Sequence, residues 1–540
     1  MNIKFVPTEF KYPFLWSWIV FFIFLATAAF HLNPDNFLAD DAYFYLQIAH
    51  QISQGHGSTF HQITPTNGYH PLWMFFCAVG SWLASGDKAL LLHLMGAFQL
   101  MLTAVSLYFL HLIGQKLQMR FWLAGAFVLT FVLVSTGGLR LFEAHLSILL
   151  QLAILYLFVT FLQGSRDQIL LVSLGGLGGL LFLTRLDTIF ILIPLTGACA
   201  CMMIKESKKL SHLSMQIAAL ALPMILLISP YLAYNYSQFG HLMPISGAIK
   251  STFPEAHFSL GLLGVHGKIA VLSAIYMLAA ILLLRLPNAV FFAILLCGIA
   301  SHAAYIASFS WGSQWYYTTA YLSAALASMQ LLTSTSCALQ KQNAKWNAFF
   351  SKGVQCSLLL LFAFSALISV LKSSFNFSAV MVGLGEQKID GRIVKNPGKE
   401  IADLLKRNLK DDAVFVFDAP GVLAYYSGLK ILPADGLIND FSYNQTIQDE
   451  GIESFLSQNN IHYYLGPLPK KGEVFASSTL KTYRQGEGYK IEVFTPIKGL
   501  PAGTFFVSDQ DQIFTAPSPV RTMGESYMVA LWKIADLKRP

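Results

Sequence analysis

Two adjacent carboxylates, Asp40 and Asp41, are the most distinctive polar pair of the chain. They lie in residues 37–73, FLADDAYFYLQIAHQISQGHGSTFHQITPTNGYHPLW, just after an apolar segment and just before a helical pattern. A carboxylate in such a place can take a proton from a substrate or bind a cation, and ionisable groups beside membrane segments tend to be functional. Asp is also a good helix N-cap, so one acid could cap the helix while the other does chemistry.

Further polar side chains stand at the ends of later apolar runs, where acids and bases could converge on one side of a membrane. They are His56, His61, Asn67, Tyr69 and His70; Arg140, Glu143 and His145; Arg185 and Asp187; Tyr234, Asn235, His241, Ser246 and Lys250; and Trp311, Gln314, Trp315, Tyr316 and Tyr317. Each also has a structural interpretation. Glu143 can pair with Arg140 at i,i+3, Arg185 with Asp187 at a helix end, and the aromatic residues can form an interfacial belt.

The composition indicates a polytopic membrane protein. Of 540 residues 55% are hydrophobic and only 12% are charged, whereas soluble proteins have roughly 25% charged residues. The net charge of +7 comes with no basic stripe or recognition motif, which argues against a nucleic-acid partner. The six cysteines lie in or beside apolar runs and show neither a disulfide framework nor a zinc spacing.

The apolar runs predict about 11 transmembrane helices with the N-terminus in the cytoplasm. The expected spans are residues 13–32, 90–113, 121–137, 145–163, 168–184, 188–204, 213–232, 262–284, 288–309, 315–334 and 354–373. The first could also be a signal peptide, but its length favours a membrane helix. Residues 72–84 are too short to span a bilayer, so we expect an interfacial helix there, behind an amphipathic helix that starts near Asp40. With this arrangement the basic clusters fall on the cytoplasmic side.

From about Ser374 the composition changes to that of a soluble domain. A helical pattern begins near Pro397, and apolar runs at 413–417, 430–433, 461–465, 491–494, 505–508 and 528–534 predict strands. We therefore expect a membrane domain over residues 1–373 and a small extracytoplasmic α/β domain over residues 374–540. Asp418, Asp435, Asn439 and Asp440 follow predicted strands, where such residues usually shape turns.

Acids and cations at the outer face of a membrane suit glycosyl transfer from a lipid-phosphate sugar. A carboxylate takes the proton of an acceptor hydroxyl, the oxygen attacks the anomeric carbon, and a cation offsets the charge on the departing phosphate. Two rival classes are a lipid-linked glycan flippase and a non-catalytic glycan-binding scaffold. A flippase should carry charged or broken-helix sites near the bilayer midplane, often in repeated halves, and the sequence shows neither.

The stretches DDAYFY, residues 40–45, and PTNGYHPLW, residues 65–73, resemble the first outer loop of GT-C glycosyltransferases. Residues 239–250, beginning FGHLMPIS, also resemble bacterial members of this superfamily, as does the arrangement of spans plus a C-terminal domain. The resemblance covers most of the chain and implies an inverting transferase of the cell envelope. Its donor would be a polyprenyl-phosphate sugar, and its acceptor an extracytoplasmic glycan, lipid or protein. The sequence departs from the superfamily at residues 141–144, LFEA, where relatives often have Gly-Met-Glu-Thr.

The resemblance also implies roles for individual residues. Asp40 or Asp41 would be the catalytic base, with Asp40 the first choice because it directly follows the membrane segment, and Glu143 would be the acid of the second loop. Substrate binding is assigned to Arg185, Lys250, His70, Asn67, Tyr69, Tyr234, Arg140 and Asp187. A divalent cation, Mg or Mn, on Asp40 and Asp41 is an alternative to neutralisation of the phosphate by Arg185 and Lys250.

Overall fold

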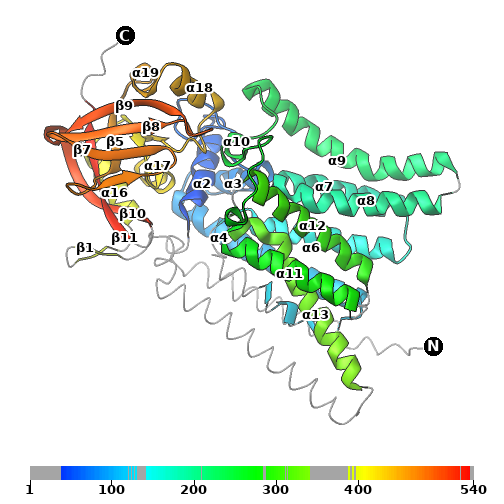
Figure 1. Cartoon of the computed structure of the whole chain (residues 1–540). Coiled ribbons are helices and arrows are strands. Elements are labelled where there is room, and N and C mark those ends of the chain that lie inside the picture. The colour runs from blue at the N-terminus through cyan, green and yellow to red at the C-terminus, as the bar shows by residue number, and fades with distance from the viewer. Residues whose placement is uncertain are drawn as a thin grey trace.

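The computed structural model describes residues 38–119, 121–122, 124–126, 128–129, 141–207, 209–283, 288–310, 312, 314–340, 387–389, 392–394, 397–522 and 525–534. The expected spans at 13–32 and 354–373, and most of the one at 121–137, lie outside these residues. The described part contains a bundle of long helices, and the strands after residue 387 gather at one end of it (Figure 1).

The described helices of the bundle lie where the apolar runs predict them. They are α4 (Lys88–Lys116), α6 (Ala144–Leu162), α7 (Gln168–Thr184), α8 (Ile189–Glu206), α9 (Leu210–Phe239), α11 (Gly264–Leu283), α12 (Ala289–Phe309) and α13 (Thr318–Gln340). Within the described residues, five segments are long and apolar enough to cross a membrane, namely Lys88–Lys116, Ala144–Leu162, Leu186–Glu206, Leu210–Phe239 and Ala289–Phe309.

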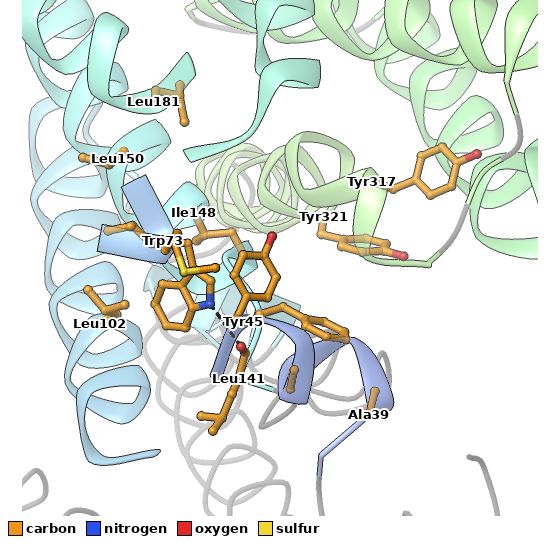
Figure 2. Packing of buried hydrophobic residues seen from close by; sticks show 14 of the residues in the cluster. Ala39, Tyr45, Trp73, Leu102, Leu141, Ile148, Leu150, Leu181, Tyr317 and Tyr321 are labelled. Carbon is orange, nitrogen blue, oxygen red and sulfur yellow. Dashed lines mark hydrogen bonds between the residues drawn. The ribbon is translucent and has the colours of Figure 1, made fainter. Parts of the chain in front are cut away.

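Two short helices, α2 (Asp40–Ser53) and α3 (Pro71–Leu83), lie between the bundle and the strands (Figure 1). The α3 helix has Pro71 in its first turn, where a missing N–H costs nothing, and its 13 residues are too few to cross a bilayer. In Figure 2 the Trp73 indole points at the Leu141 carbonyl, and its Nε1 donates a hydrogen bond to that oxygen at 3.2 Å. This bond ties α3 to the start of α6, next to Glu143.

Three further short elements complete the part of the chain that surrounds the candidate site. They are α10 (Ile245–Lys250), η3 (Leu260–Leu263) and η4 (Gln314–Tyr317), and η2 (Leu186–Thr188) connects α7 to α8. Asn67 holds the first loop to this region, because its Oδ1 accepts the Ile245 N–H at 3.1 Å and its Nδ2 lies 3.4 Å from Asn235 Oδ1. Segments far apart in sequence are thereby fixed at the same end of the bundle.

The C-terminal domain begins with the hairpin β1 (Gln387–Ile389) and β2 (Arg392–Val394) and contains two further sheets. The five-stranded sheet has the order β10-β11-β5-β3-β4, with β3 (Ala413–Val416) parallel to both β4 (Lys430–Pro433) and β5 (Ile461–Pro467). Strands β10 (Gln512–Thr522) and β11 (Glu525–Lys533) extend it in antiparallel fashion. The helices of this domain are α16 (Pro397–Asn408), α17 (Pro420–Ser427), α18 (Phe441–Asp449) and α19 (Ile452–Gln458).

The second large sheet of this domain is antiparallel and has the order β6-β7-β8-β9. Its strands are β6 (Val474–Ala476), β7 (Leu480–Gln485), β8 (Gly488–Phe494) and β9 (Pro501–Ser508), and η5 (Asp509–Asp511) follows them. Side chains of both sheets, including Phe415, Tyr464, Ile491 and Phe505, pack into one buried cluster. The predicted combination of membrane helices with a C-terminal domain that contains sheets is confirmed.

Helix α17 joins the C-terminal domain to α2 and α4. The Asp40 carboxylate accepts hydrogen bonds from the Gly421 and Val422 N–H groups at 3.0 and 2.8 Å, at the N-terminal end of α17. Near the other end, Lys88 Nζ donates to the Tyr425 carbonyl at 2.5 Å. The α17 helix is therefore held at both ends by hydrogen bonds from side chains of the preceding part of the chain.

Candidate active site

A pocket opens between the helix bundle and the C-terminal domain, and both contribute to its walls. Its empty space is about 600 Å³ when the open mouth is included. It is lined by Asp41, Phe44, Tyr45, Ile48, Gly68, Tyr69, His70, Phe142, Glu143, Ser246, Lys250, Trp315, Tyr316, Leu437 and Ile438. Aromatic side chains, two acids and one lysine therefore share one cavity at the end of the bundle.

The two adjacent acids of α2 have different surroundings. Asp41 lines the pocket, whereas Asp40 binds the α17 backbone through both of its oxygens. Burial raises the pKa of Asp40 to about 8, although the Val422 and Gly421 amides act to lower it. Successive helical side chains point about 100° apart, so the two carboxylates point in different directions. Asp40 therefore caps α17, and Asp41 is the α2 acid within reach of a ligand.

Lys250, the last residue of α10, supplies the cation of the pocket. Its Nζ lies 5.9 Å from the centroid of the Tyr316 ring. Burial acts to lower the pKa of Lys250, but Tyr316, Asp41 and Glu143 outweigh it and the net shift is upward. The ammonium consequently keeps its charge at neutral pH. Asp41 and Lys250 thus place opposite charges in the same cavity.

Glu143 is held by a buried ionic array at the bundle end. Arg185 Nη1 lies 2.5 Å from Glu143 Oε1, and the same guanidinium binds Asp187 in bidentate fashion at 3.0 and 2.6 Å. Glu143 and Arg185 are only 4% and 2% exposed. His302 Nε2 lies 3.7 Å from Asp187 Oδ2 on the far side. Arg185 is therefore occupied by two carboxylates and fixes the Glu143 side chain.

Tyr45 and His70 complete the surroundings of Glu143. The Tyr45 hydroxyl donates to Glu143 Oε2 at 3.3 Å, and His70 Nε2 lies 3.8 Å from Glu143 Oε1. Burial lowers the pKa of His70 more than the Glu143 carboxylate raises it, so the imidazole is neutral at pH 7. Burial also raises the pKa of Tyr45. Glu143 therefore contacts three different groups, namely the Arg185 guanidinium, the Tyr45 phenol and the His70 imidazole.

The other predicted site residues are placed as follows. Tyr69 lines the pocket, and its hydroxyl lies 2.6 Å from Ser58 Oγ. Asn67 is buried and ties the first loop to α10, and Asp187 belongs to the ionic array. Tyr234 is 45% exposed on α9 and is not part of the lining that the described residues form. Arg140 lies outside the described residues.

Residues of the β4–α18 loop were not predicted to belong to the site. Leu437 and Ile438 line the pocket, and the sequence interpretation gives their neighbour Asp435 only a turn-shaping role. Burial raises the pKa of Asp435 to about 6, and the charges of Asp41 and Lys250 also act on it. The position of this loop just after a parallel strand was an available signal, because ligands often bind at the carboxyl ends of such strands.

A divalent cation on Asp40 and Asp41 does not fit this arrangement. Both oxygens of Asp40 accept backbone N–H groups, and the described residues hold no group of three His, Cys, Asp or Glu side chains that could bind a metal ion. Lys250 lines the pocket and is protonated, so it can supply the positive charge that would neutralise a bound phosphate.

Comparison with known proteins gives a likeness in fold. No model of a protein family matches the chain, and no curated protein sequence matches it. Its structure is similar to that of ArnT from Cupriavidus metallidurans bound to undecaprenyl phosphate, with a TM-score of 0.54 and 13% identity over 83% of this chain and 96% of ArnT.

Two other structures are more distant. The Archaeoglobus fulgidus oligosaccharyltransferase has a TM-score of 0.43 and 12% identity over 83% of this chain and 67% of its own. AftD from Mycobacteria, an arabinofuranosyltransferase, has a TM-score of 0.46 and 12% identity over 95% of this chain and 40% of its own. The predicted GT-C resemblance is confirmed at the level of fold by the likeness to ArnT.

Proposed function

We propose that this protein is an inverting membrane glycosyltransferase that moves a sugar from a polyprenyl-phosphate donor to an extracytoplasmic glycan, lipid or protein. The observation that carries the proposal is the pairing of Asp41 with Lys250 in one pocket at the end of a membrane helix bundle. A base and a phosphate-binding cation are the two groups that this reaction needs. The fold likeness to ArnT, whose structure holds undecaprenyl phosphate, supports the choice of donor.

Asp41 is the proposed general base in place of Asp40. Its carboxylate takes the proton of the acceptor hydroxyl as that oxygen forms a bond to the anomeric carbon. The bond between the anomeric carbon and the phosphate oxygen breaks on the opposite side, and its electron pair leaves with the lipid phosphate. One displacement inverts the anomeric centre. Asp41 afterwards releases the proton to water at the pocket mouth.

Lys250 is the proposed partner of the leaving phosphate. Its ammonium lines the pocket and stays protonated, so it can stabilise the negative charge that grows on the phosphate oxygen. Arg185 is unsuited to this task because Glu143 and Asp187 already occupy its guanidinium. We assign Arg185 and Asp187 to positioning, and they act through Glu143.

Glu143 is proposed to orient the sugar. Its position is fixed by Arg185 and Tyr45, and it lines the same cavity as Asp41. An ionised carboxylate accepts hydrogen bonds from sugar hydroxyls, and such bonds hold the anomeric carbon in line for attack. His70 and Tyr69 add neutral polar groups to the same wall.

The proposed topology places the pocket on the outer side of a bacterial inner membrane. The N-terminus lies in the cytoplasm, about 11 helices cross the bilayer, and residues 374–540 form the extracytoplasmic domain. Residues 1–373 form the membrane domain. This arrangement brings a donor lipid from between the helices to a pocket that the C-terminal domain covers.

The direct test is transfer by the full-length protein in proteoliposomes. The donors are polyprenyl-phosphate hexoses and pentoses labelled in the sugar, and the acceptors are extracted from envelope membranes. We expect labelled acceptor and free polyprenyl phosphate in equal amounts, and at least about 10²-fold slower product formation by the Asp41→Asn protein. Movement of intact donor across the bilayer without sugar release would identify a flippase instead.

A further inference from the structure

The turn before α6 brings two consecutive side chains, Phe142 and Glu143, to the pocket. Both line the cavity, and the Phe142 ring packs against Trp315 with a centroid distance of 5.3 Å. The preceding residue, Leu141, is buried and has φ +51°, a left-handed conformation that residues with a Cβ seldom adopt. Such a conformation persists only where neighbouring groups hold it. The contacts of Leu141 therefore decide where the next two side chains point.

Gln99 of α4 binds the backbone of this turn with both atoms of its side-chain amide. Its Oε1 accepts the Leu141 N–H at 3.3 Å, and its Nε2 donates to the Phe142 carbonyl at 3.4 Å. Gln99 is buried, and its helix is one of the segments long and apolar enough to cross a membrane. A polar side chain in such a place is costly unless its hydrogen bonds are made. Gln99 is therefore matched to the turn that it binds.

Trp73 of α3 binds the same turn from a second helix. Its indole Nε1 donates to the Leu141 carbonyl at 3.2 Å, as Figure 2 shows. The indole is buried and stacks on Phe98 of α4 with a centroid distance of 6.1 Å. Leu141 is thus bound through both its N–H and its carbonyl. Rotation of either adjoining peptide unit would break one of these hydrogen bonds.

We propose that Gln99 and Trp73 are positioning residues, which hold Leu141 in its left-handed conformation so that Phe142 and Glu143 together bind the sugar of the donor. Neither Gln99 nor Trp73 belongs to the lining that the described residues form, so both act through the turn. This inference rests on the proposed glycosyl transfer, and it specifies which part of the pocket receives the sugar.

An aromatic wall beside a carboxylate suits a sugar ring. The faces of a sugar ring carry C–H groups that can pack on Phe142 and Trp315, and its edge carries hydroxyls that donate to Glu143. Arg185 and Tyr45 bind the carboxylate of Glu143. The turn sets the position of the Glu143 backbone. Buried groups therefore fix this side chain at both ends.

Two single substitutions remove the hydrogen bonds of the turn with little change in apolar packing. Gln99→Leu removes the partners of the Leu141 N–H and the Phe142 carbonyl. Trp73→Phe removes the Nε1 donor and keeps an aromatic ring against Phe98. A comparison of the two variants tests the turn from two different helices.

Gln330→Leu is the matched control. Gln330 is also a buried glutamine of the bundle, and its amide pairs with Asn288 at 3.4 Å and with Ser334 at 3.2 Å. None of these three residues belongs to the pocket lining that the described residues form. The control therefore loses buried hydrogen bonds, and stability with them, without altering the turn.

The experiment is a double-mutant cycle with Glu143→Gln in the full-length protein in lipid nanodiscs. Its readout is the sugar-dependent part of binding, which is the Kd for polyprenyl phosphate divided by the Kd for a polyprenyl-phosphate hexose or pentose. We expect Glu143→Gln and Gln99→Leu each to lower this ratio by about tenfold, and Trp73→Phe by about fivefold. Gln330→Leu should keep the wild-type ratio even where its melting temperature falls.

The combination of substitutions separates positioning from general destabilisation. In the Glu143→Gln background we expect Gln99→Leu to lower the ratio by no more than about threefold, because the carboxylate that it positions is already absent. A full tenfold loss in that background would overturn the inference. So would a wild-type ratio in Gln99→Leu, or a ratio of one in the wild type for every donor. If Gln99→Leu does not fold, the same cycle with Trp73→Phe decides.

Sugar release from the donors is measured on the same samples. Coupled losses of sugar-dependent binding without release from any donor would count against the proposed transfer alone. Release by the wild type together with uncoupled losses would count against the positioning role alone. The two failures can therefore be told apart.

Discussion

Asp40 and Val422 are joined by a 2.8 Å hydrogen bond although 382 positions separate them in the sequence. The bond links the start of α2 to the start of α17, and the next residue of α2 is Asp41. Any shift of the C-terminal domain is therefore coupled to the position of the proposed base and to the Leu437–Ile438 wall. The acid that the sequence favoured as catalyst is in this structure the group that docks the domain.

Loss of the Asp40 carboxylate should loosen this docking. In Asp40→Ala, two N–H groups of α17 lose their acceptor, and we expect the free energy of unfolding to fall by about 1–3 kcal/mol. Thermal unfolding of the purified protein in nanodiscs measures the change, and Asp41→Asn, at the neighbouring acid that lines the pocket, is the control. An unchanged melting temperature in Asp40→Ala would show that the bond has no role in docking.

Removal of Arg185 should be far more damaging than its exchange for a smaller cation. Arg185→Leu leaves Glu143 and Asp187 as buried acids without a partner, which costs about 3–5 kcal/mol. Arg185→Lys keeps the charge but loses the bidentate contact, so it should fold and show reduced kcat. Folded yield and melting temperature report the first effect, and steady-state transfer reports the second. Wild-type stability of Arg185→Leu would contradict the paired array.

Lys250 gives a prediction about the leaving group. Lys250→Met retains the length of the side chain and removes the charge, and we expect kcat to fall by about 10²- to 10³-fold. Lys250→Arg should keep a larger part of the activity. Single-turnover cleavage of the donor measures this step directly. Donor cleavage at the wild-type rate in Lys250→Met would mean that another group stabilises the phosphate.

Much of the fold could be predicted because long apolar runs are strong signals. The predicted spans at 90–113 and 145–163 correspond to α4 and α6, and the short apolar run after Pro71 corresponds to the 13-residue α3. Strands β7 and β10 were missed for physical reasons. The β7 sequence, LKTYRQ, is polar on an antiparallel sheet, and β10 contains two prolines, which usually argue against a strand.

The site was harder to predict than the fold. The sequence identified the acidic pair and Lys250, but it could not assign Asp40 and Asp41 to different partners, because that depends on where α17 docks some 380 residues later. Arg185 was assigned to the phosphate, with an ion pair to Asp187 as the structural alternative, and the structure shows that pair together with a second one to Glu143. Asp435 was read as a turn residue. It does shape a turn, and the same turn faces the pocket.

The most direct test of the central claim compares Asp41→Asn with Asp40→Asn in one reconstituted transfer assay with a polyprenyl-phosphate sugar. Both changes replace a carboxylate by an amide of equal size, and Asn can still accept an N–H from α17. The account predicts that Asp41→Asn lowers kcat by about 10²- to 10⁴-fold while Asp40→Asn, where folded, stays within about tenfold of the wild type. Full activity of Asp41→Asn together with an inactive but folded Asp40→Asn would contradict it.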